Sequence, residues 1–196
     1  MDVAVVLDIV QPGTPVTLRS EIERELMRRK IRIRRGGYLS IPISFVLAKN
    51  KLFLALAVPS PGTELKIGEE IDLRDKKKVL GWVRVSYDDL TSIAKEELEH
   101  VIEKIVEEKE KDFVEFFNKA GPITTRLHTL ELLPGIGKKH MWDIIEKRRK
   151  PFTSYKDIKE RIPLMPEPRK SIKERILQEL KGGEKYYLFV LPPRRA

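Results

Sequence analysis

Hydrophobic residues between Asp2 and Ser86 fall into short runs, several of which alternate with polar residues. The runs read VAVVLDIV, KIRIRR, YLSIPISFVL, KLFLALAV, EIDL and VLGWVRVS, and Gly, Pro and Asn residues separate them. Alternation with a period of two is typical of strands that bury one face, and Gly and Pro mark the turns between them. The pattern predicts a small β-barrel of the OB-like or SH3-like type over residues 1–90.

The hydrophobic period changes to 3.6 in the middle of the chain. Ser86 or Thr91 can cap a helix there, and the AGP sequence at 120–122 ends the pattern. A long amphipathic connecting helix is therefore predicted over 91–121. We expect its apolar stripe to pack inside the protein, and the alternative is that residues 95–119 dock a partner protein.

Residues 122–183 carry only helical patterns. Four short helices are predicted: one in TTRLHTLELL with Thr124 as its cap, one in KKHMWDIIEKRR, one in TSYKDIKERI with Ser154 and Asp157 as a capping pair, and one after PLMPEP. The tail over 184–196 contains KYYLFV, which predicts a strand that returns to the barrel sheet because the helical domain offers it no partner. The predicted fold class is therefore α+β.

Composition narrows the function classes. The chain of 196 residues is 41% hydrophobic, which suffices for a real core, but its longest apolar run, LFLALAV, is too short to cross a membrane. The first residues lack the basic start of a secretory signal, so we expect a cytoplasmic protein without a membrane partner. The absence of cysteine excludes disulfides and thiolate zinc sites, and the three histidines lack ligand spacing, so no metal site is predicted. The abundance of Lys and Glu is typical of proteins from hot environments.

The net charge of +9 is distributed unevenly along the chain. Residues 122–196 contain 18 Lys and Arg against 9 Asp and Glu, whereas residues 91–121 contain 5 against 9. A basic domain behind an acidic segment indicates a polyanionic partner, because each neutralised phosphate releases condensed counterions. A solvated basic surface without a partner explains the charge equally well, so the local motifs decide.

The segment LPGIGKK joins two of the predicted helices in a helix-hairpin-helix pattern. Gly135 and Gly137 can take a positive or otherwise strained φ, and their missing side chains let a phosphate approach the backbone on either side of Ile136. The N–H groups from Gly135 through Lys139 point outward at the start of a helix, where the macrodipole also favours an anion. Lys138 and Lys139 supply neutralising charge, and contacts of this kind position a nucleic acid without reading its bases. A tight corner that only packs two helices is the alternative.

Two further sets of arginines extend the candidate surface. Arg148 and Arg149 follow the hairpin at the end of the next predicted helix. In RRKIRIRRGGY, alternation places Arg32 and Arg34 on one strand face, where they can contact nucleic acid. A charged edge strand that prevents aggregation explains the same alternation.

The chain resembles an archaeal family known as the domain of unknown function 655. The resemblance rests on NKAGPITTRLHTLELLPGIGKKHMWDIIEKR, on VSYDDLTSIAKEELEHVIEKIVEE and on the closing KYYLFV, and it runs the length of the chain. It implies an OB-like barrel joined to a helix-hairpin-helix domain that binds DNA or RNA, with the motif on residues 133–139. In some hairpins of this class backbone carbonyls bind a monovalent cation, and here these carbonyls belong to Glu131, Leu133 and Ile136.

An enzymatic function is the remaining alternative. Base-excision glycosylases with a similar hairpin use a lysine after the second glycine and a later aspartate, for which Lys139 and Asp157 are the candidates. Asp157 lies in SYKDIKER rather than in a VDTH-like sequence, and a barrel stands where much of the catalytic domain should be. We therefore expect a protein without catalysis that binds DNA or structured RNA independently of sequence. A protein-interaction adaptor is the second hypothesis.

Overall fold

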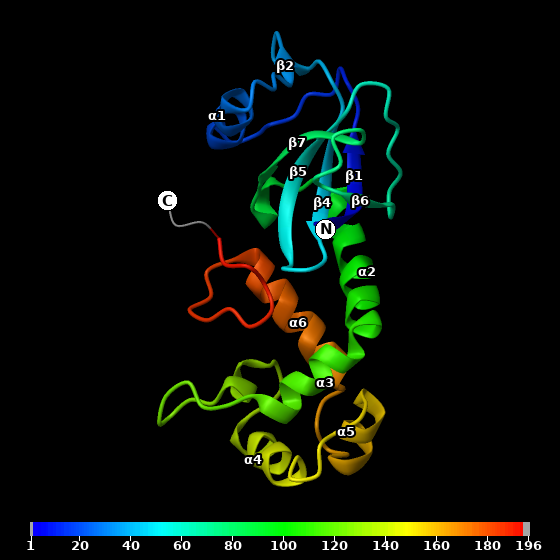
Figure 1. The fold of residues 1–196 in the computed structure, drawn as a ribbon. Helices are drawn as coiled ribbons and strands as arrows, with labels where there is room; N and C mark the ends of the chain where they lie inside the picture. Colours follow the sequence, from blue (N-terminus) through cyan, green and yellow to red (C-terminus); the bar gives the residue numbers. More distant parts are fainter. Residues whose placement is uncertain (1, 194–196) are drawn as a thin grey trace. The chain divides into compact units, whose positions relative to one another are not determined.

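A computed structural model describes residues 2–193 (Figure 1). The fold is mixed α+β and divides into two compact units, one formed by residues 1–101 with 179–196 and the other by residues 102–178. The divisions fall inside the helices α2 (Ser92–Glu108) and α6 (Pro168–Lys181), so two helices run from one unit into the other. No helix of residues 2–193 is both long and apolar enough to cross a membrane.

The first unit contains a curled antiparallel sheet of five strands in the order β6-β1-β4-β5-β7. These strands are β1 (Val3–Val10), β4 (Ile43–Ala48), β5 (Phe53–Pro59), β6 (Glu70–Asp72) and β7 (Val79–Arg84). Strands β6 and β7 are the two edges, so the sheet is a half-barrel and does not close into the predicted barrel. Only three residues of β6 pair with β1, and α1 (Ser20–Arg28) packs against β7 on the other side.

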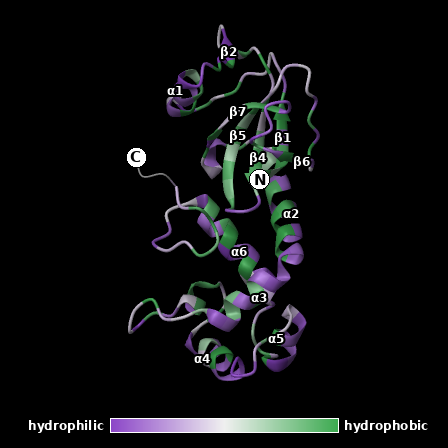
Figure 2. Ribbon diagram, in the orientation of Figure 1, coloured by the Kyte–Doolittle hydropathy of each residue, from purple (hydrophilic) through white to green (hydrophobic). Residues whose placement is uncertain are grey.

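The two central strands β4 and β5 are buried on both faces of the sheet. Residues of β4 and β5 are buried without exception, and Figure 2 shows strongly hydrophobic strands. On one face Ala57 pairs with Trp82 and Ala55 with Arg84, which brings small side chains of β5 beside large ones of β7. This face includes the core formed by Ala4, Val6, Val46, Ala48, Phe53, Ala55, Ala57, Leu65, Ile71, Leu73 and Val79.

Helix α1 was not predicted, and the strand expected in KIRIRR is mostly irregular. Apolar Ile22 and Leu26 lie one turn apart on the buried face of α1, which is the helical signal in SEIERELMR. Lys30, with a φ of +62°, ends the helix. Of the predicted strand only β2 (Arg34–Arg35) pairs, with β3 (Tyr38–Leu39). Gly36 and Gly37, both with positive φ, form the turn of this short hairpin.

The helix predicted over 91–121 is two helices, α2 and α3 (Glu110–Lys119), which are separated at Lys109. Of the two alternative caps predicted for this helix, Thr91 is confirmed, because its Oγ1 accepts from the Ala94 N–H at the start of α2. Ser86 instead precedes the separate 3₁₀ helix η1 (Tyr87–Asp89), where its N–H and hydroxyl donate to the Asp89 carboxylate. The apolar stripe is buried at Leu98, Val101, Ile102, Ile105, Val106, Phe113, Val114 and Phe117. This burial favours packing within the chain over the docking of a partner protein on residues 95–119.

The second unit also contains the 3₁₀ helix η2 (Thr129–Leu132), α4 (Lys138–Lys147), α5 (Tyr155–Arg161) and the first part of α6. The predicted helix in TTRLHTLELL is wrong in length and type, because only η2 forms there. The Thr124 hydroxyl accepts the N–H groups of Arg126 and Leu127 in a turn, which competes with a helix at this point. Ser154 caps α5 by accepting from the Asp157 N–H at 2.9 Å, as predicted.

The C-terminal tail returns to the first unit as predicted, but KYYLFV forms no strand. The Glu179 carboxylate accepts the N–H groups of Leu188, Phe189 and Val190 at 2.7–2.9 Å, so these donors are not available for a β-ladder. The next N–H, that of Leu191, donates to the carbonyls of residues 51 and 52 beside β5. Glu179 is only 1% exposed, and its carboxylate therefore holds the tail in place.

Candidate nucleic-acid interface

The LPGIG turn is a compact loop between η2 and α4. The Ile136 N–H donates to the Leu133 carbonyl at 3.0 Å, and Gly135 has a φ of +80°, a conformation that favours glycine. Ile136 is 3% exposed and anchors the turn in the core, so it contributes to the candidate surface only through its backbone. The Leu133 carbonyl, expected among the cation ligands, is an acceptor inside the turn.

The two glycines have different roles. A Cβ atom on Gly135 would lie 2.7 Å from Cγ of Pro166, whereas a Cβ on Gly137 would have no neighbour within 4 Å. Gly137 is the N-cap residue of α4 and is extended, with a φ of −93° and a ψ of −171°. Gly135 therefore allows close packing, and Gly137 leaves open space at the helix start.

The N-terminus of α4 is uncapped. No hydrogen bond within the described part of the chain uses the N–H groups of Gly137, Lys138, Lys139 or His140, and the first turn contains no acidic residue. The first N–H groups of a helix have no acceptor inside the helix, and the macrodipole makes this end positive. The open space at Gly137 thus leads to N–H donors that an anion can reach.

The two lysines of the motif differ in their contacts. Lys138 Nζ lies 3.2 Å from Glu131 Oε1 and donates to the Arg126 carbonyl, so its charge is partly compensated. The pKa of Glu131 lies below its ordinary value. The main cause is the hydrogen bond that its carboxylate accepts from the His128 N–H, and the contact with Lys138 adds to the effect. Lys139 is exposed and has no ion pair among residues 2–193, so its charge is available to bind an anionic ligand.

Trp142 belongs to the same surface and was missed in the sequence. Its side chain is 62% exposed, which is unusual for so large an apolar group. It lies four residues after Lys138 and three after Lys139, so all three occupy one face of α4. The signal was a tryptophan at a polar position of the helical pattern, next to the buried Met141.

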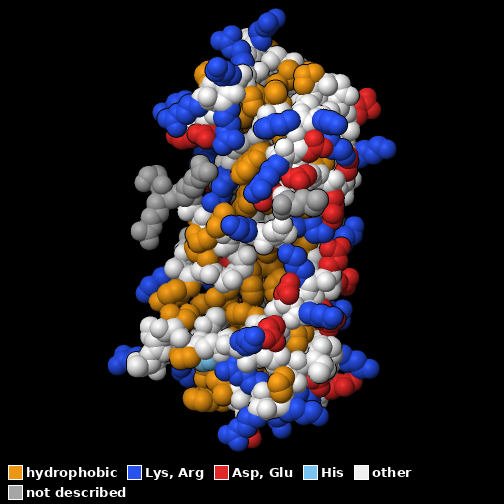
Figure 3. All heavy atoms as spheres, viewed as in Figure 1, with side chains coloured by type: hydrophobic (Ala, Val, Ile, Leu, Met, Phe, Trp, Pro, Cys, Tyr) orange, Lys and Arg blue, Asp and Glu red, His pale blue; other side chains and the backbone are white. Residues whose placement is uncertain are grey.

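Arg149 and Arg148 are adjacent but have different surroundings. Arg149 is exposed, and in Figure 3 Lys and Arg side chains gather over α4 and the turn that follows it. Arg148 Nη1 donates to the Phe117 carbonyl at 3.1 Å and to the Ala120 carbonyl at 2.6 Å, and burial lowers its pKa. Arg148 therefore satisfies the C-terminal end of α3, and we remove it from the candidate surface. Lys139, Trp142 and Arg149, with the open helix start at Gly137, are hereafter called the α4 surface.

Arg32 and Arg34 lie in the first unit. Arg32 is exposed, whereas Arg34 Nε lies 3.1 Å from Glu23 Oε1 in an ion pair. Both line a small cavity of about 330 Å³ with Met27 and Ile31. An arginine whose charge is already paired has less to offer a phosphate, so Arg32 is the better candidate of the two.

Of the two residues considered for catalysis, Asp157 has structural partners. Burial alone would raise the pKa of Asp157, but hydrogen bonds from the Thr153 N–H and from Arg161 lower it overall. Its carboxylate therefore stabilises the start of α5. Among residues 2–193 no group of three or more His, Asp or Glu side chains is arranged to hold a metal ion.

Three comparisons relate this chain to known proteins. The model of a family described as "Protein of unknown function (DUF655)" matches residues 2–191. An uncharacterized protein of Methanocaldococcus jannaschii is 44% identical over 155 residues, which cover 76% of this chain and 70% of that protein. A crystal structure from the same family, of a protein from Archaeoglobus fulgidus, has a TM-score of 0.77 and 36% identity and covers 97% of this chain and 100% of its own.

Proposed function

This chain belongs to the DUF655 family of proteins of unknown function, and we propose that it binds the phosphate backbone of DNA or structured RNA through the α4 surface, without catalysis. The membership confirms the resemblance found in the sequence and brings no activity with it. We also propose that the half-barrel is OB-like and that η2, the LPGIG turn and α4 form a helix-hairpin-helix. The positive φ at Gly135 and the core position of Ile136 support this assignment.

The observation that carries the proposal is the uncapped start of α4 beside open space at Gly137. Backbone N–H groups bind phosphate oxygens well, because they are fixed in place and their dipoles point at the anion. Because no side chain of the described residues competes for them, an incoming phosphate displaces only water. The contact recognises the backbone, so affinity is expected to depend little on base sequence.

The side chains of the α4 surface extend this contact. Lys139 supplies a charge that no ion pair within residues 2–193 compensates, and Arg149 adds a second basic group beyond the other end of α4. Trp142 lies between them and offers an exposed ring to a sugar or an unpaired base. A solvated basic face without a partner does not account for the exposed tryptophan. Nucleic-acid binding accounts for both the charge and the exposed aromatic side chain.

The salt dependence of binding tests the proposal. Labelled duplex DNA, duplex RNA and a single strand are titrated with the full chain at several salt concentrations, and the expected log-linear weakening reports the number of phosphates neutralised. Lys139→Ala with Arg149→Ala should weaken binding at least tenfold and reduce the salt slope by about one to two. The control, Lys76→Ala with Lys77→Ala, removes the same charge from a loop of the first unit. Equal losses in both variants would mean that net charge alone attracts the nucleic acid.

A further inference from the structure

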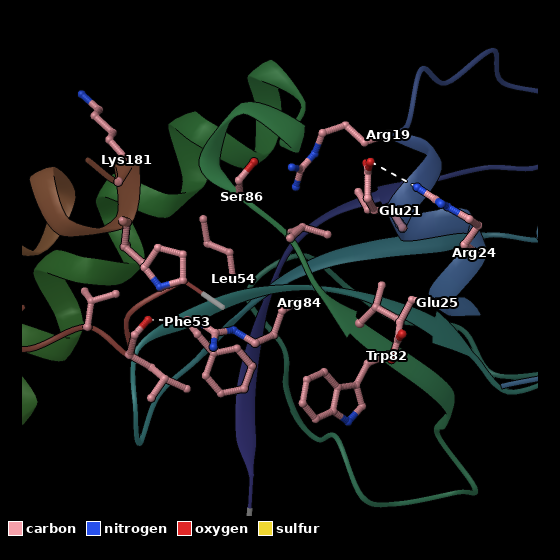
Figure 4. A pocket seen from close by; sticks show the side chains of 18 of the residues that line it. Arg19, Glu21, Arg24, Glu25, Phe53, Leu54, Trp82, Arg84, Ser86 and Lys181 are labelled. Atoms are coloured by element: carbon pink, nitrogen blue, oxygen red, sulfur yellow. Dashed lines mark hydrogen bonds and ion pairs between the residues drawn. The ribbon is translucent and has the colours of Figure 1, made fainter. Parts of the chain in front are cut away.

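The first unit contains a cavity of about 620 Å³ that has no part in the proposed function. Helix α1, strands β5 and β7 and the segments 179–182 and 190–193 line it (Figure 4). Its volume is within the range of roughly 300–1,000 Å³ that is typical of small-molecule sites.

Two aromatic rings and two guanidinium groups form the aromatic part of the cavity. The rings of Phe53 and Trp82 lie 5.6 Å apart at an interplanar angle of 30°. Arg84 lies over the Phe53 ring at 5.4 Å and Arg29 over the Trp82 ring at 5.7 Å. Trp82 is only partly buried, so part of its side chain remains accessible at the cavity. Planar rings stack well on surfaces made of aromatic and guanidinium groups.

The cavity wall is positively charged. Its lining contains the six cations Arg19, Arg24, Arg28, Arg29, Arg84 and Lys181 and the three carboxylates Glu21, Glu25 and Glu179. Glu179 is occupied by the N–H groups of the tail, Glu21 forms an ion pair with Arg24, and Glu25 is shared by Arg28 and Arg29. The excess of cations favours an anionic ligand.

The wall is also held in place before any ligand binds. Arg84 Nη2 donates to the carbonyls of Leu191 and Pro192 at 2.9 and 2.8 Å, which fixes its guanidinium over Phe53. Arg19 donates through Nε and Nη2 to the Asp89 carboxylate, both at 2.7 Å, and its side chain is still 53% exposed. The guanidinium N–H groups of Arg19 that do not face Asp89 can bind a phosphate while the ion pair with Asp89 stays intact.

From these contacts we infer that the cavity binds a nucleotide, with the base stacked at Trp82 and the phosphate among the arginines that flank and form part of α1. A nucleotide combines the two features that the lining selects for, a planar ring and a negative charge. The ligand is either a free nucleotide or one unit of a single strand, since both present the same chemistry. This site is separate from the α4 surface and does not depend on it.

Calorimetric titration of the full chain tests the inference. The ligands are AMP, adenosine, inorganic phosphate and a five-residue oligothymidylate. We expect AMP or the oligonucleotide to bind, and adenosine and phosphate to bind at least tenfold more weakly than the ligand that carries both groups. At least tenfold tighter binding of the oligonucleotide than of AMP identifies a strand, and the reverse or equal affinities identify a free nucleotide.

Substitutions in the cavity lining test where the ligand binds. Trp82→Leu and Arg29→Gln should each weaken binding at least tenfold, and the second variant keeps the result interpretable if the first does not fold. Arg74→Gln, an exposed arginine of the same unit outside the cavity lining, is the matched control and should have no effect. Gly137→Asp should also leave the affinity for AMP unchanged, which separates this site from the α4 surface. Absence of binding by both AMP and the oligonucleotide, or affinities unaffected by Trp82→Leu and Arg29→Gln, would overturn the inference.

Discussion

Gly135 and Pro166 are packed so closely that a Cβ atom on Gly135 would lie 2.7 Å from the proline Cγ. Pro166 belongs to PLMPEP, the glycine-free loop between α5 and α6, and Met165 beside it is 1% exposed. Through this contact the loop packs against the LPGIG turn.

Gly135→Ala should therefore destabilise the fold rather than act on binding alone. The left-handed φ of +80° and the overlap with Pro166 together cost about 2–4 kcal/mol. Urea unfolding measures the loss, and Gly121→Ala, at a glycine with open space and no positive φ, is the control. Addition of Pro166→Ala should recover the steric part, and strictly additive effects of the two substitutions would contradict the contact.

The elements that the sequence predicted are those with a repeating pattern of their own. Strands β1, β4, β5, β6 and β7 and the helices α4, α5 and α6 follow from short apolar runs, helical spacing and caps. The missed helix α1 carries the signal in only two apolar positions, Ile22 and Leu26, among charged ones. The failure of KYYLFV to form a strand depends on Glu179, a buried carboxylate, and no local pattern shows that its oxygens take the donors of the tail.

In the candidate site, too, some features follow from a local sequence motif and others depend on tertiary contacts. The position of the LPGIG turn and the exposure of Lys139 could be predicted from LPGIGKK, because the sequence fixes the local backbone. The roles of Arg148 and Arg149 could not, because the two are neighbours of equal charge and differ only in tertiary contacts. The difference between Gly135 and Gly137 likewise depends on Pro166, which is distant in sequence.

Arg148 and Arg149 should respond oppositely to substitution. Arg148→Ala removes two hydrogen bonds to carbonyls at the end of α3, and we expect a loss of about 1.5–3 kcal/mol in unfolding free energy. Arg149→Ala should change stability by less than about 0.5 kcal/mol and should weaken binding of duplex DNA or RNA. Thermal unfolding of both variants, and their titration with duplex DNA or RNA at one salt concentration, test this prediction. Similar stabilities for the two variants would contradict the role of Arg148.

His128 should make the hairpin sensitive to acid. Its Nδ1 accepts the Leu130 N–H at 3.1 Å, and burial, followed by the charge of Arg148, lowers its pKa although Glu131 opposes the shift. The unfolded chain therefore takes up a proton near pH 6.5 that the folded chain resists, so stability is full above this pH and falls as the pH decreases below it. His128→Asn keeps a capping acceptor but does not titrate. Urea unfolding at pH 7.5 and 5.5 should show a smaller loss for this variant than for the parent chain.

Glu179→Gln should loosen the C-terminal tail. The carboxylate accepts three N–H groups, and an amide cannot replace it as an acceptor at all of them. We expect faster tryptic cleavage after Lys185, which is exposed, at a protease concentration that leaves the remaining chain intact. An unchanged cleavage rate would mean that other contacts hold the tail.

The central claim is that the N–H groups at the start of α4 bind phosphate, and substitutions at Gly137 test it most directly. Its extended backbone and open surroundings suit an N-cap side chain, so Gly137→Asp and Gly137→Ser should both fold and gain up to about 1 kcal/mol of stability. The aspartate also places a carboxylate where the phosphate would bind, whereas the serine adds no charge.

The deciding measurement is the affinity of the three full-length chains for one labelled duplex at one salt concentration. Stability and binding should move in opposite directions for Gly137→Asp, which should bind at least tenfold more weakly than the parent chain although it is at least as stable. Gly137→Ser should remain within a few-fold of the parent. A Gly137→Asp chain that is folded and binds as tightly as the parent would contradict the phosphate site at the start of α4.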